Sequence, residues 1–183
     1  MRAFHFLGVA GQIGVAALLL LASAGGRDGS LLAQSRKSQP AALEQTMGDT
    51  KIIIRYNRPS ARGRALFGAL VPWGKEWNPG ADEATTIDVS RDVLVNGHPL
   101  RSGRYSFWVI PRAERWTLIF SAAADVPHTP YPAGRDVLRM MLPTKLAPHV
   151  ETLVFYCPET DATHATLRVQ WGTVAVDLSV TAP

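Results

Sequence analysis

Residues 72–86, PWGKEWNPGADEATT, hold the densest group of side chains that could do chemistry in this 183-residue chain. Two of them are indoles, those of Trp73 and Trp77. The carboxylates of the segment belong to Glu76, Asp82 and Glu83. Aromatic faces bind rings by stacking, and a pair of carboxylates can serve as an acid and a base. The segment is therefore a stacking surface, an acid pair or a packed loop.

The stacking interpretation combines the two tryptophans with a basic segment upstream. Residues 51–64 carry five basic side chains and no acidic one. From this segment, Arg58 and Arg64 would supply charged hydrogen-bond donors beside the rings of Trp73 and Trp77. The combination predicts a small-molecule, carbohydrate or anionic ligand.

The other two interpretations centre on Glu83. As an acid or a base it would act with Glu76 or with Asp82, although neighbours on an extended strand point to opposite faces. As a structural group it would pair with Arg58 or Arg64 beneath a loop that only covers the domain. The residues alone leave all three alternatives open.

Other kinds of chemistry find no support in the residue pattern. After the leader the histidines stand singly, without the close spacing of metal ligands, at positions His98, His128, His149 and His164. Residues 68–75, GALVPWGK, lack the spacing and the final Ser or Thr of a phosphate loop. No G-x-S-x-G motif is present in the chain. We therefore expect no metal and no cofactor.

The fold class follows from an alternation of apolar and polar residues that begins near residue 51. Alternation with a period of two is typical of strands, and no helical period is sustained. About nine short strands are predicted, at residues 52–57, 85–90, 93–96, 105–110, 116–121, 137–142, 150–157, 165–171 and 174–180. Together they predict an all-β domain, an antiparallel β-sandwich or jelly-roll-like barrel. Short helical turns are expected at residues 59–70 and 132–140.

Several local patterns refine this expectation. Asn96-Gly97 is typical of a type I′ turn, and Gly172 with Thr173 predicts a tight connection in a C-terminal hairpin. Residues 105–110 are apolar on both faces, which indicates a central strand. The apolar phase of the last two segments predicts the burial of Leu167, Val169, Trp171, Val174, Val176 and Leu178.

The chain begins with the pattern of a signal peptide. Arg2 precedes an apolar run that ends in Ala22, Ser23 and Ala24, an A-x-A site, so residues 1–24 predict an N-terminal signal helix. A second small-residue site lies near Ala33. This leader implies export, either to the periplasm or out of the cell. Export argues against a nucleic-acid partner. An uncleaved leader would anchor the chain, and that is the only membrane contact we expect.

The rest of the chain divides into a linker and one domain. Residues 25–46 are rich in Gly, Ser, Gln and Ala, which predicts a flexible linker, and residues 47–183 predict a single domain. Cys157 is the only cysteine, so no intrachain disulfide can form. Its apolar surroundings predict a buried, unreactive thiol.

From residue 46 to residue 180 the chain resembles an uncharacterised bacterial family, domain of unknown function 2911. A Tyr-x-Arg-Pro-Ser step, a Gly-Arg step, a Trp followed by Gly-Ala-x-Glu-Ala-Thr, and a Gly-x-Tyr carry the likeness. The matching residues are Tyr56, Arg58, Pro59, Ser60, Gly63, Arg64, Trp77, Gly80, Ala81, Glu83, Ala84, Thr85, Gly103 and Tyr105. Asn78 and Asp82 depart from the family pattern, which has Arg and Asn there. The resemblance implies an exported β-rich domain and no specific activity.

These observations favour an exported, non-catalytic binding or envelope-associated module. The alternative is a hydrolase of a cell-envelope or extracellular carbohydrate that uses Glu83 with a partner from another loop. The candidate ligand-binding residues are Tyr56, Arg58, Arg64, Trp73, Trp77, Asp82 and Glu83.

The leader pattern makes a prediction about processing. Cleavage after Ala24 should give a mature protein that begins at Gly25, because the A-x-A site closes a short apolar core. N-terminal sequencing of the exported protein measures this directly. Recovery of Met1 on a membrane-bound product would contradict it.

Overall fold

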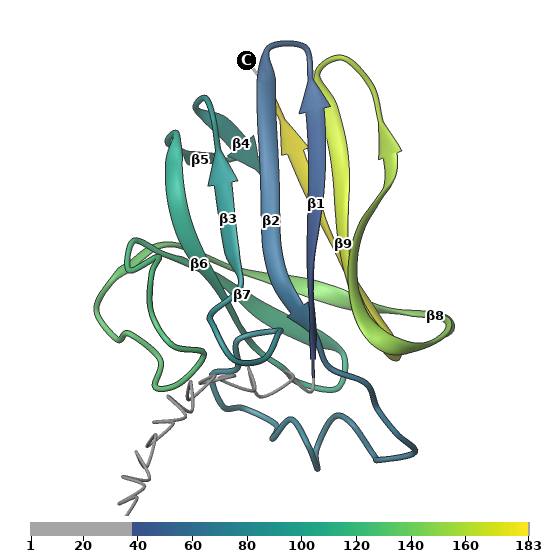
Figure 1. The fold of residues 1–183 in the computed structure, drawn as a ribbon. Helices are drawn as coiled ribbons and strands as arrows, with labels where there is room; N and C mark the ends of the chain where they lie inside the picture. Colours follow the sequence, from purple (N-terminus) through teal and green to yellow (C-terminus); the bar gives the residue numbers. More distant parts are fainter. Residues whose placement is uncertain (1–37, 183) are drawn as a thin grey trace, which may run out of the picture. The chain divides into compact units, whose positions relative to one another are not determined.

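The computed structural model describes residues 38–182, and in that range the chain forms strands and loops but no helix (Figure 1). The prediction of an all-β domain is therefore confirmed for this part of the chain. The predicted signal helix at residues 1–24 and the linker residues 25–37 lie outside the described residues. Across the described range, a helix with the length and apolar character needed to cross a membrane is not found.

Nine strands form one antiparallel sheet. Their bounds are β1 (Gln39–Met47), β2 (Thr50–Arg58), β3 (Thr86–Val89), β4 (Val93–Val95), β5 (His98–Leu100), β6 (Gly103–Ile110), β7 (Arg115–Ser121), β8 (Asp136–Thr160) and β9 (His164–Thr181). The order in the sheet is β1-β2-β3-β6-β7-β8-β9-β4-β5. No ladder joins the two outer strands, β1 and β5, so the sheet is open. The ladders thus describe one open antiparallel sheet, and the sandwich or jelly-roll-like arrangement of that sheet stays a prediction.

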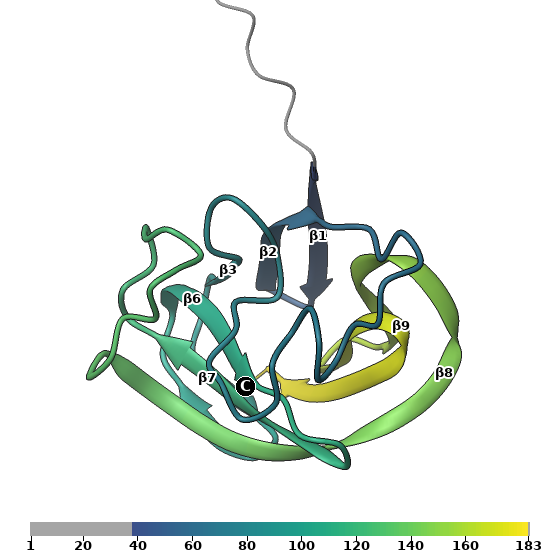
Figure 2. The same ribbon diagram turned by 90° about the horizontal axis from the view of Figure 1, so that it is seen from below.

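The hairpin of β8 and β9 dominates the architecture, and each of its strands spans two predicted ones. Residues 136–143 of β8 pair with β7, and residues 144–160 pair with β9. The register between β8 and β9 shifts at three places, and Figure 2 shows β8 as a long arc. Bulges bend a strand and increase its twist. They explain how so long a hairpin curves around the core.

The prediction of a tight connection at Gly172 and Thr173 is wrong, because both residues lie within the continuous strand β9. Gly172 has a φ of +58°, and the register with β8 shifts beside it. The left-handed conformation that glycine adopts easily changes the phase of the strand here without reversing the chain. The signal read as a turn is thus an irregularity within one strand.

The sequence pattern also misses two strands, both at the edges of the sheet. β1 covers residues 39–47, so the prediction of a flexible linker up to residue 46 is wrong over that stretch. β5 contains Pro99 and pairs with β4 through the turn Asn96-Gly97. Both turn residues have positive φ, +48° and +82°, which confirms the predicted type I′ turn. The helical turns expected at residues 59–70 and 132–140 are absent; the first segment is a loop and the second enters β8.

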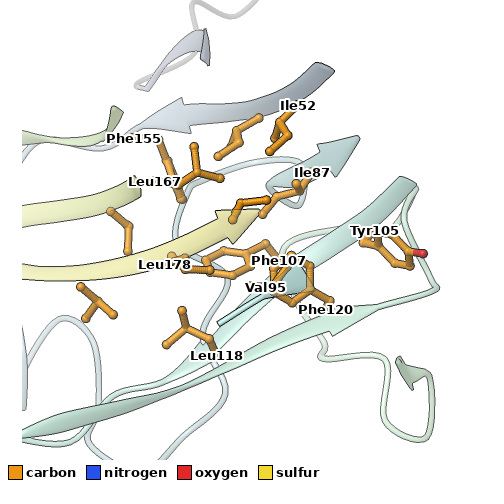
Figure 3. Close-up of a cluster of buried hydrophobic side chains, with 14 of the residues drawn as sticks. Ile52, Ile87, Val95, Tyr105, Phe107, Leu118, Phe120, Phe155, Leu167 and Leu178 are labelled. Carbon is orange, nitrogen blue, oxygen red and sulfur yellow. The ribbon is translucent and has the colours of Figure 1, made fainter. Parts of the chain in front are cut away.

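The main core lies on the inner face of the curved sheet. Figure 3 shows side chains from several strands converging there, including Phe107, Leu118, Phe155 and Leu178. Five of the six residues predicted to be buried on β9 are buried, and Val174 is partly buried against the same core. The predicted register of β9 is therefore right on both sides of Gly172.

The outer face of β6 carries a second, smaller core. Trp108 and Ile119 are buried there with Ala84, and the loop of residues 122–135 covers them. The Trp108 and Tyr131 rings meet edge to face at 5.3 Å. This cover confirms that β6, predicted as central from its two apolar faces, is buried on both.

A short bridge links the end of β2 to the middle of β8. Ala61 N donates to Glu151 O at 2.9 Å, and Leu153 N donates to Pro59 O at 3.0 Å. Ser60 and Thr152 form an isolated antiparallel bridge between them. The loop that leads from β2 to β3 thus begins by pairing with the curved hairpin.

Cys157 is partly buried in β8, and its Sγ lies 3.2 Å from Glu159 O. Burial raises the pKa of the thiol. A raised pKa keeps the thiol protonated, which agrees with the predicted low reactivity.

The hairpin contains an ion-pair network that predicts a pH-dependent contribution to stability. Asp177 accepts hydrogen bonds from Arg168 Nη2 and Lys145 Nζ, both at 2.7 Å, and its side chain is 15% exposed. The hydrogen bond from Arg168, with a smaller contribution from Lys145, lowers the pKa of Asp177. A lowered folded-state pKa means that the stabilisation is present above the unfolded value, about 4, and is lost as the pH falls through the folded-state value.

Asp177→Asn should therefore reduce the free energy of unfolding by about 1 to 3 kcal/mol at pH 7, and by less at pH 3. Urea unfolding at the two pH values measures the difference. Asp49→Asn is the control, because the Asp49 side chain is 85% exposed and lies 3.5 Å from Arg91. An equal effect of the two substitutions at pH 7 would contradict the assignment.

Candidate functional site

The loop between β2 and β3, residues 59–85, crosses one end of the sheet below the strands in Figure 1. Backbone hydrogen bonds attach it to the end of β6. Trp77 and Val109 exchange two of them, both 2.8 Å long, and Gly74 N donates to Pro111 O at 2.9 Å. This attachment holds the two tryptophans of the loop in defined positions.

Trp73 and Trp77 each stack on a different ring. Trp73 lies on Phe67, with ring centroids 5.9 Å apart and an interplanar angle of 28°. Trp77 lies on Trp171, with centroids 5.9 Å apart and an angle of 20°. Trp73 is 45% exposed, whereas Trp77 is partly buried. Trp73 is therefore the ring with an aromatic surface available to a ligand.

Gly68 explains how Trp73 lies so close to its own loop. Its φ is +88°, and a Cβ at this position would lie 2.3 Å from Trp73 Nε1. Only glycine can adopt this backbone conformation and leave room for the indole. Glycine at position 68 thus allows the Trp73 ring to pack against its own loop.

Two adjoining hollows surround these rings, and we call them together the aromatic groove. One has a volume of about 460 Å³ and is lined by Trp77 and Arg62. The other has a volume of about 520 Å³ and is lined by Trp73 and Glu151, among others. Both hollows have Arg64 and Trp171 in their walls. The groove therefore combines aromatic surfaces with charged groups in both hollows.

Arg58 and Arg64 are oriented by hydrogen bonds to nearby groups. Arg58 donates from Nε to Leu153 O at 3.2 Å and from Nη2 to Thr152 Oγ1 at 2.8 Å. Arg64 donates from Nε and Nη2 to the carbonyl oxygens of residues 61 and 60, at 2.9 and 2.7 Å. Arg58 thus supports the bridge between β2 and β8, while Arg64 lines the aromatic groove.

Glu83 lies beside Asn57, near the end of β2. Its Oε2 accepts a hydrogen bond from Asn57 Nδ2 at 3.0 Å, and the same nitrogen donates to Ala81 O at 2.7 Å. Among the salt bridges of residues 38–182, none joins Glu83 to Arg58 or Arg64. The predicted pairing of Glu83 with one of these arginines is therefore not found among the described residues, and Asn57 is a partner that sequence reasoning missed.

Tyr56 belongs mainly to the core. It is 7% exposed, and its ring meets Phe155 edge to face at 4.8 Å. Its hydroxyl accepts a hydrogen bond from Phe155 N at 3.1 Å. This predicted ligand residue is thus occupied in joining β2 to β8.

A larger cavity, of about 960 Å³, lies on the outer face of the sheet, and we call it the sheet-face cavity. Its lining comes from β1, from β2, β3 and β6, and from the loop of residues 122–135. The structure brings Asp82 and Glu83 to this cavity, away from the two tryptophans. The predicted site residues therefore divide between two places.

Strand register explains the polar floor of this cavity. Arg55 lies opposite Thr86, Thr86 opposite Ser106, and Ser106 opposite Ser121, so one row of polar residues crosses four strands. Residues directly opposite in antiparallel strands share a face. The signal in the sequence is a small polar residue in each of three largely apolar strands, which sequence reasoning did not use.

Two buried side chains in the cavity wall carry atoms without a partner. Asn57 and Thr86 are 4% and 5% exposed. Within residues 38–182, no hydrogen bond reaches Asn57 Oδ1 or Thr86 Oγ1. Buried polar atoms are usually satisfied, so each exception calls for an explanation.

The two departures from the family pattern have structural roles. Asn78 is 1% exposed, donates to Phe107 O at 2.7 Å and accepts from Thr85 N at 2.8 Å. Asp82 has a φ of +64°, a conformation that Asn and Asp adopt more readily than most residues. Its carbonyl oxygen lies 2.6 Å from His128 Nδ1, which ties the loop to residues 122–135. Replacement of Asn by Asp at position 82 thus keeps the backbone of the loop.

Thr85 and Thr86 are adjacent, and they allow a matched test of the Thr86 hydroxyl, which has no hydrogen-bond partner in the described chain. Thr85 is buried and donates from Oγ1 to Pro79 O at 2.8 Å. Thr85→Val should cost about 1 to 3 kcal/mol of unfolding free energy, because it leaves that carbonyl oxygen without its donor. Thr86→Val should be neutral or stabilising, because it removes a hydroxyl that has no partner. Urea unfolding of the two variants decides the matter, and an equal loss in both would contradict the hydrogen-bond assignment.

Comparison with known proteins gives one positive result. No curated protein and no solved structure matches the chain. The model of the family described as "Protein of unknown function (DUF2911)" matches residues 38–180. This range agrees with a domain that begins with β1, and it includes both the aromatic groove and the sheet-face cavity. The chain is therefore a member of the DUF2911 family.

Proposed function

We propose that this domain is a non-catalytic binding module that works outside the cytoplasm and holds an acidic oligosaccharide in the aromatic groove. The observation that carries the proposal is the pair of adjoining hollows with Arg64 and Trp171 in common and an exposed Trp73 ring in one of them. In this proposal the curved sheet is a sandwich-like scaffold for the groove.

Ring stacking supports a sugar or a similarly flat ligand. Trp73 presents its indole to solvent and rests on Phe67, so the ring is already ordered before a ligand arrives. An aromatic ring buries a large area at a small cost in conformational entropy. Because the adjoining 460 Å³ hollow is lined by Trp77, a chain of linked rings fits the groove better than a single ring.

The charges of the groove favour carboxylate groups on that ligand. Arg62 and Arg64 line it against one acidic side chain, Glu151. Glu151 Oε1 already accepts a hydrogen bond from Arg62 N at 2.6 Å. The bonds that orient Arg64 use Nε and Nη2, and a guanidinium has five N–H donors, so donors remain for a ligand carboxylate.

The same inventory supports binding without hydrolysis in the groove. Glycoside hydrolysis normally needs two carboxyl groups that flank the scissile bond. The described lining of the groove contains Glu151 as its acidic side chain. The leader pattern of residues 1–24 supports a location outside the cytoplasm, where acidic polysaccharides of cell envelopes occur.

Isothermal titration calorimetry of the mature protein with a hexamer of galacturonic acid tests this function. We expect saturable binding that weakens about tenfold in Trp73→Ala and in Arg64→Met. A neutral glucose hexamer should bind about tenfold more weakly than the acidic one. Leu94→Ala is the control, because Leu94 is 44% exposed on β4 and does not line the groove.

Two results would contradict the proposal. Unchanged affinity in Trp73→Ala would exclude the groove as the binding site. Equal affinity for the acidic and neutral hexamers would leave a carbohydrate module but remove the preference for carboxylates.

A second candidate function is hydrolysis of a carbohydrate by Glu83. The observation that favours it is that Glu83 and Asp125, from two different loops, both line the sheet-face cavity. A polysaccharide substrate should then release reducing ends at a rate that Glu83→Gln abolishes while the fold is retained. No release above the buffer rate by the wild-type protein would exclude this function.

A further inference from the structure

We propose that the sheet-face cavity is a second binding site, which takes a small molecule rich in O–H or N–H donors, such as a sugar or an amino sugar. The site is distinct from the aromatic groove and does not depend on the function proposed for it. Its volume, about 960 Å³, lies within the usual range of small-molecule sites.

The first support is that two of the three buried side-chain atoms without a hydrogen-bond partner in residues 38–182 belong to the cavity wall, on Asn57 and Thr86; the third is Trp116 Nε1. Ser106 Oγ donates to Ala123 O at 2.7 Å and accepts from Trp108 Nε1 at 2.8 Å. Ser121 Oγ accepts from Ala123 N at 3.3 Å. Thr86 lies in the same row, yet its Oγ1 has no partner in the described chain. The row is therefore hydrogen-bonded at Ser106 and Ser121, and it lacks a partner at Thr86, which lines the cavity.

The second support is the orientation of the Asn57 amide. Its Nδ2 lies between two acceptors, Ala81 O and Glu83 Oε2. Exchanging the amide oxygen and nitrogen would place Oδ1 against both acceptors, so the assignment is determined by its surroundings. Asn57 thus offers a carbonyl oxygen, which can only accept, in the cavity wall.

The third support is the charge balance, which disfavours an anion. Arg55 forms an ion pair with Asp88. Arg104 Nη2 lies 3.2 Å from Asp125 Oδ1, and its Nε lies 3.8 Å from Asp88 Oδ1. Asp82 adds a further carboxylate to the lining. Both arginines of the lining are thus paired with acids, and the described lining holds three carboxylates, those of Asp82, Glu83 and Asp125, so the cavity is rich in acceptors.

The walls of the cavity are formed in advance of any ligand. Ala84 N donates to Val126 O at 3.2 Å, and Ala122 N donates to Arg135 O at 2.8 Å, which holds residues 122–135 over the sheet. Opposite them, β1 contributes the small side chains of residues 40–42. Because the Thr86 hydroxyl is buried, binding includes a rotation of this side chain, for which Thr86 has other staggered positions.

The test uses three probes with one ring skeleton: glucose, glucosamine and glucuronate. Calorimetric titration of the mature protein should give the tightest binding for glucosamine, weaker binding for glucose and the weakest for glucuronate. Thr86→Val should weaken glucosamine binding at least about tenfold, because a ligand group would lose its partner. Thr85→Val, the adjacent matched variant, should leave the affinity unchanged.

Trp73→Ala separates this site from the aromatic groove, since it should not change glucosamine binding. Three outcomes would overturn the proposal: no saturable binding of any probe to the wild-type protein, an unchanged affinity in Thr86→Val, or the tightest binding for glucuronate. Loss of glucosamine binding in Trp73→Ala would instead assign the probe to the groove and likewise overturn it.

Discussion

A single open sheet can bury one of its faces only by curving onto itself, and the bent hairpin of β8 and β9 provides that curve. The three register shifts bend the hairpin, so that core residues of β6 and β7 meet those of β9. The same curvature lets residues 59–61 pair with residues 151–153 and brings Trp77 onto Trp171. Both the core and the aromatic groove thus depend on the irregular pairing of one hairpin.

The loop of residues 59–85 contributes to both the aromatic groove and the sheet-face cavity. Its first part supplies Arg64 and Trp73 to the aromatic groove, and its last part supplies Asp82 and Glu83 to the sheet-face cavity. Between them the buried amide of Asn78 joins the loop to β6. A segment that looks in sequence like one site is therefore the wall between two.

Sequence alone predicted the features that depend on neighbours along the chain. Alternation located most strands, and Asn96-Gly97 identified its turn because both residues favour positive φ. The continuity of β9 through Gly172 could not be predicted, because a left-handed glycine serves in a turn or a bulge equally well. The hydrogen bond between Asn57 and Glu83 was missed because Asn57 is a polar residue in a strand, and its burial depends on distant segments of the chain.

The edges of the open sheet have a consequence for self-association. An edge strand presents unpaired N–H and C=O groups that can template a ladder with another copy of the chain. Here each edge contains a proline, Pro40 on β1 and Pro99 on β5, and β5 is only three residues long. Each proline removes one N–H donor from its edge. The sheet thus stays open while its edges are poorly suited to pairing with a second copy of the chain.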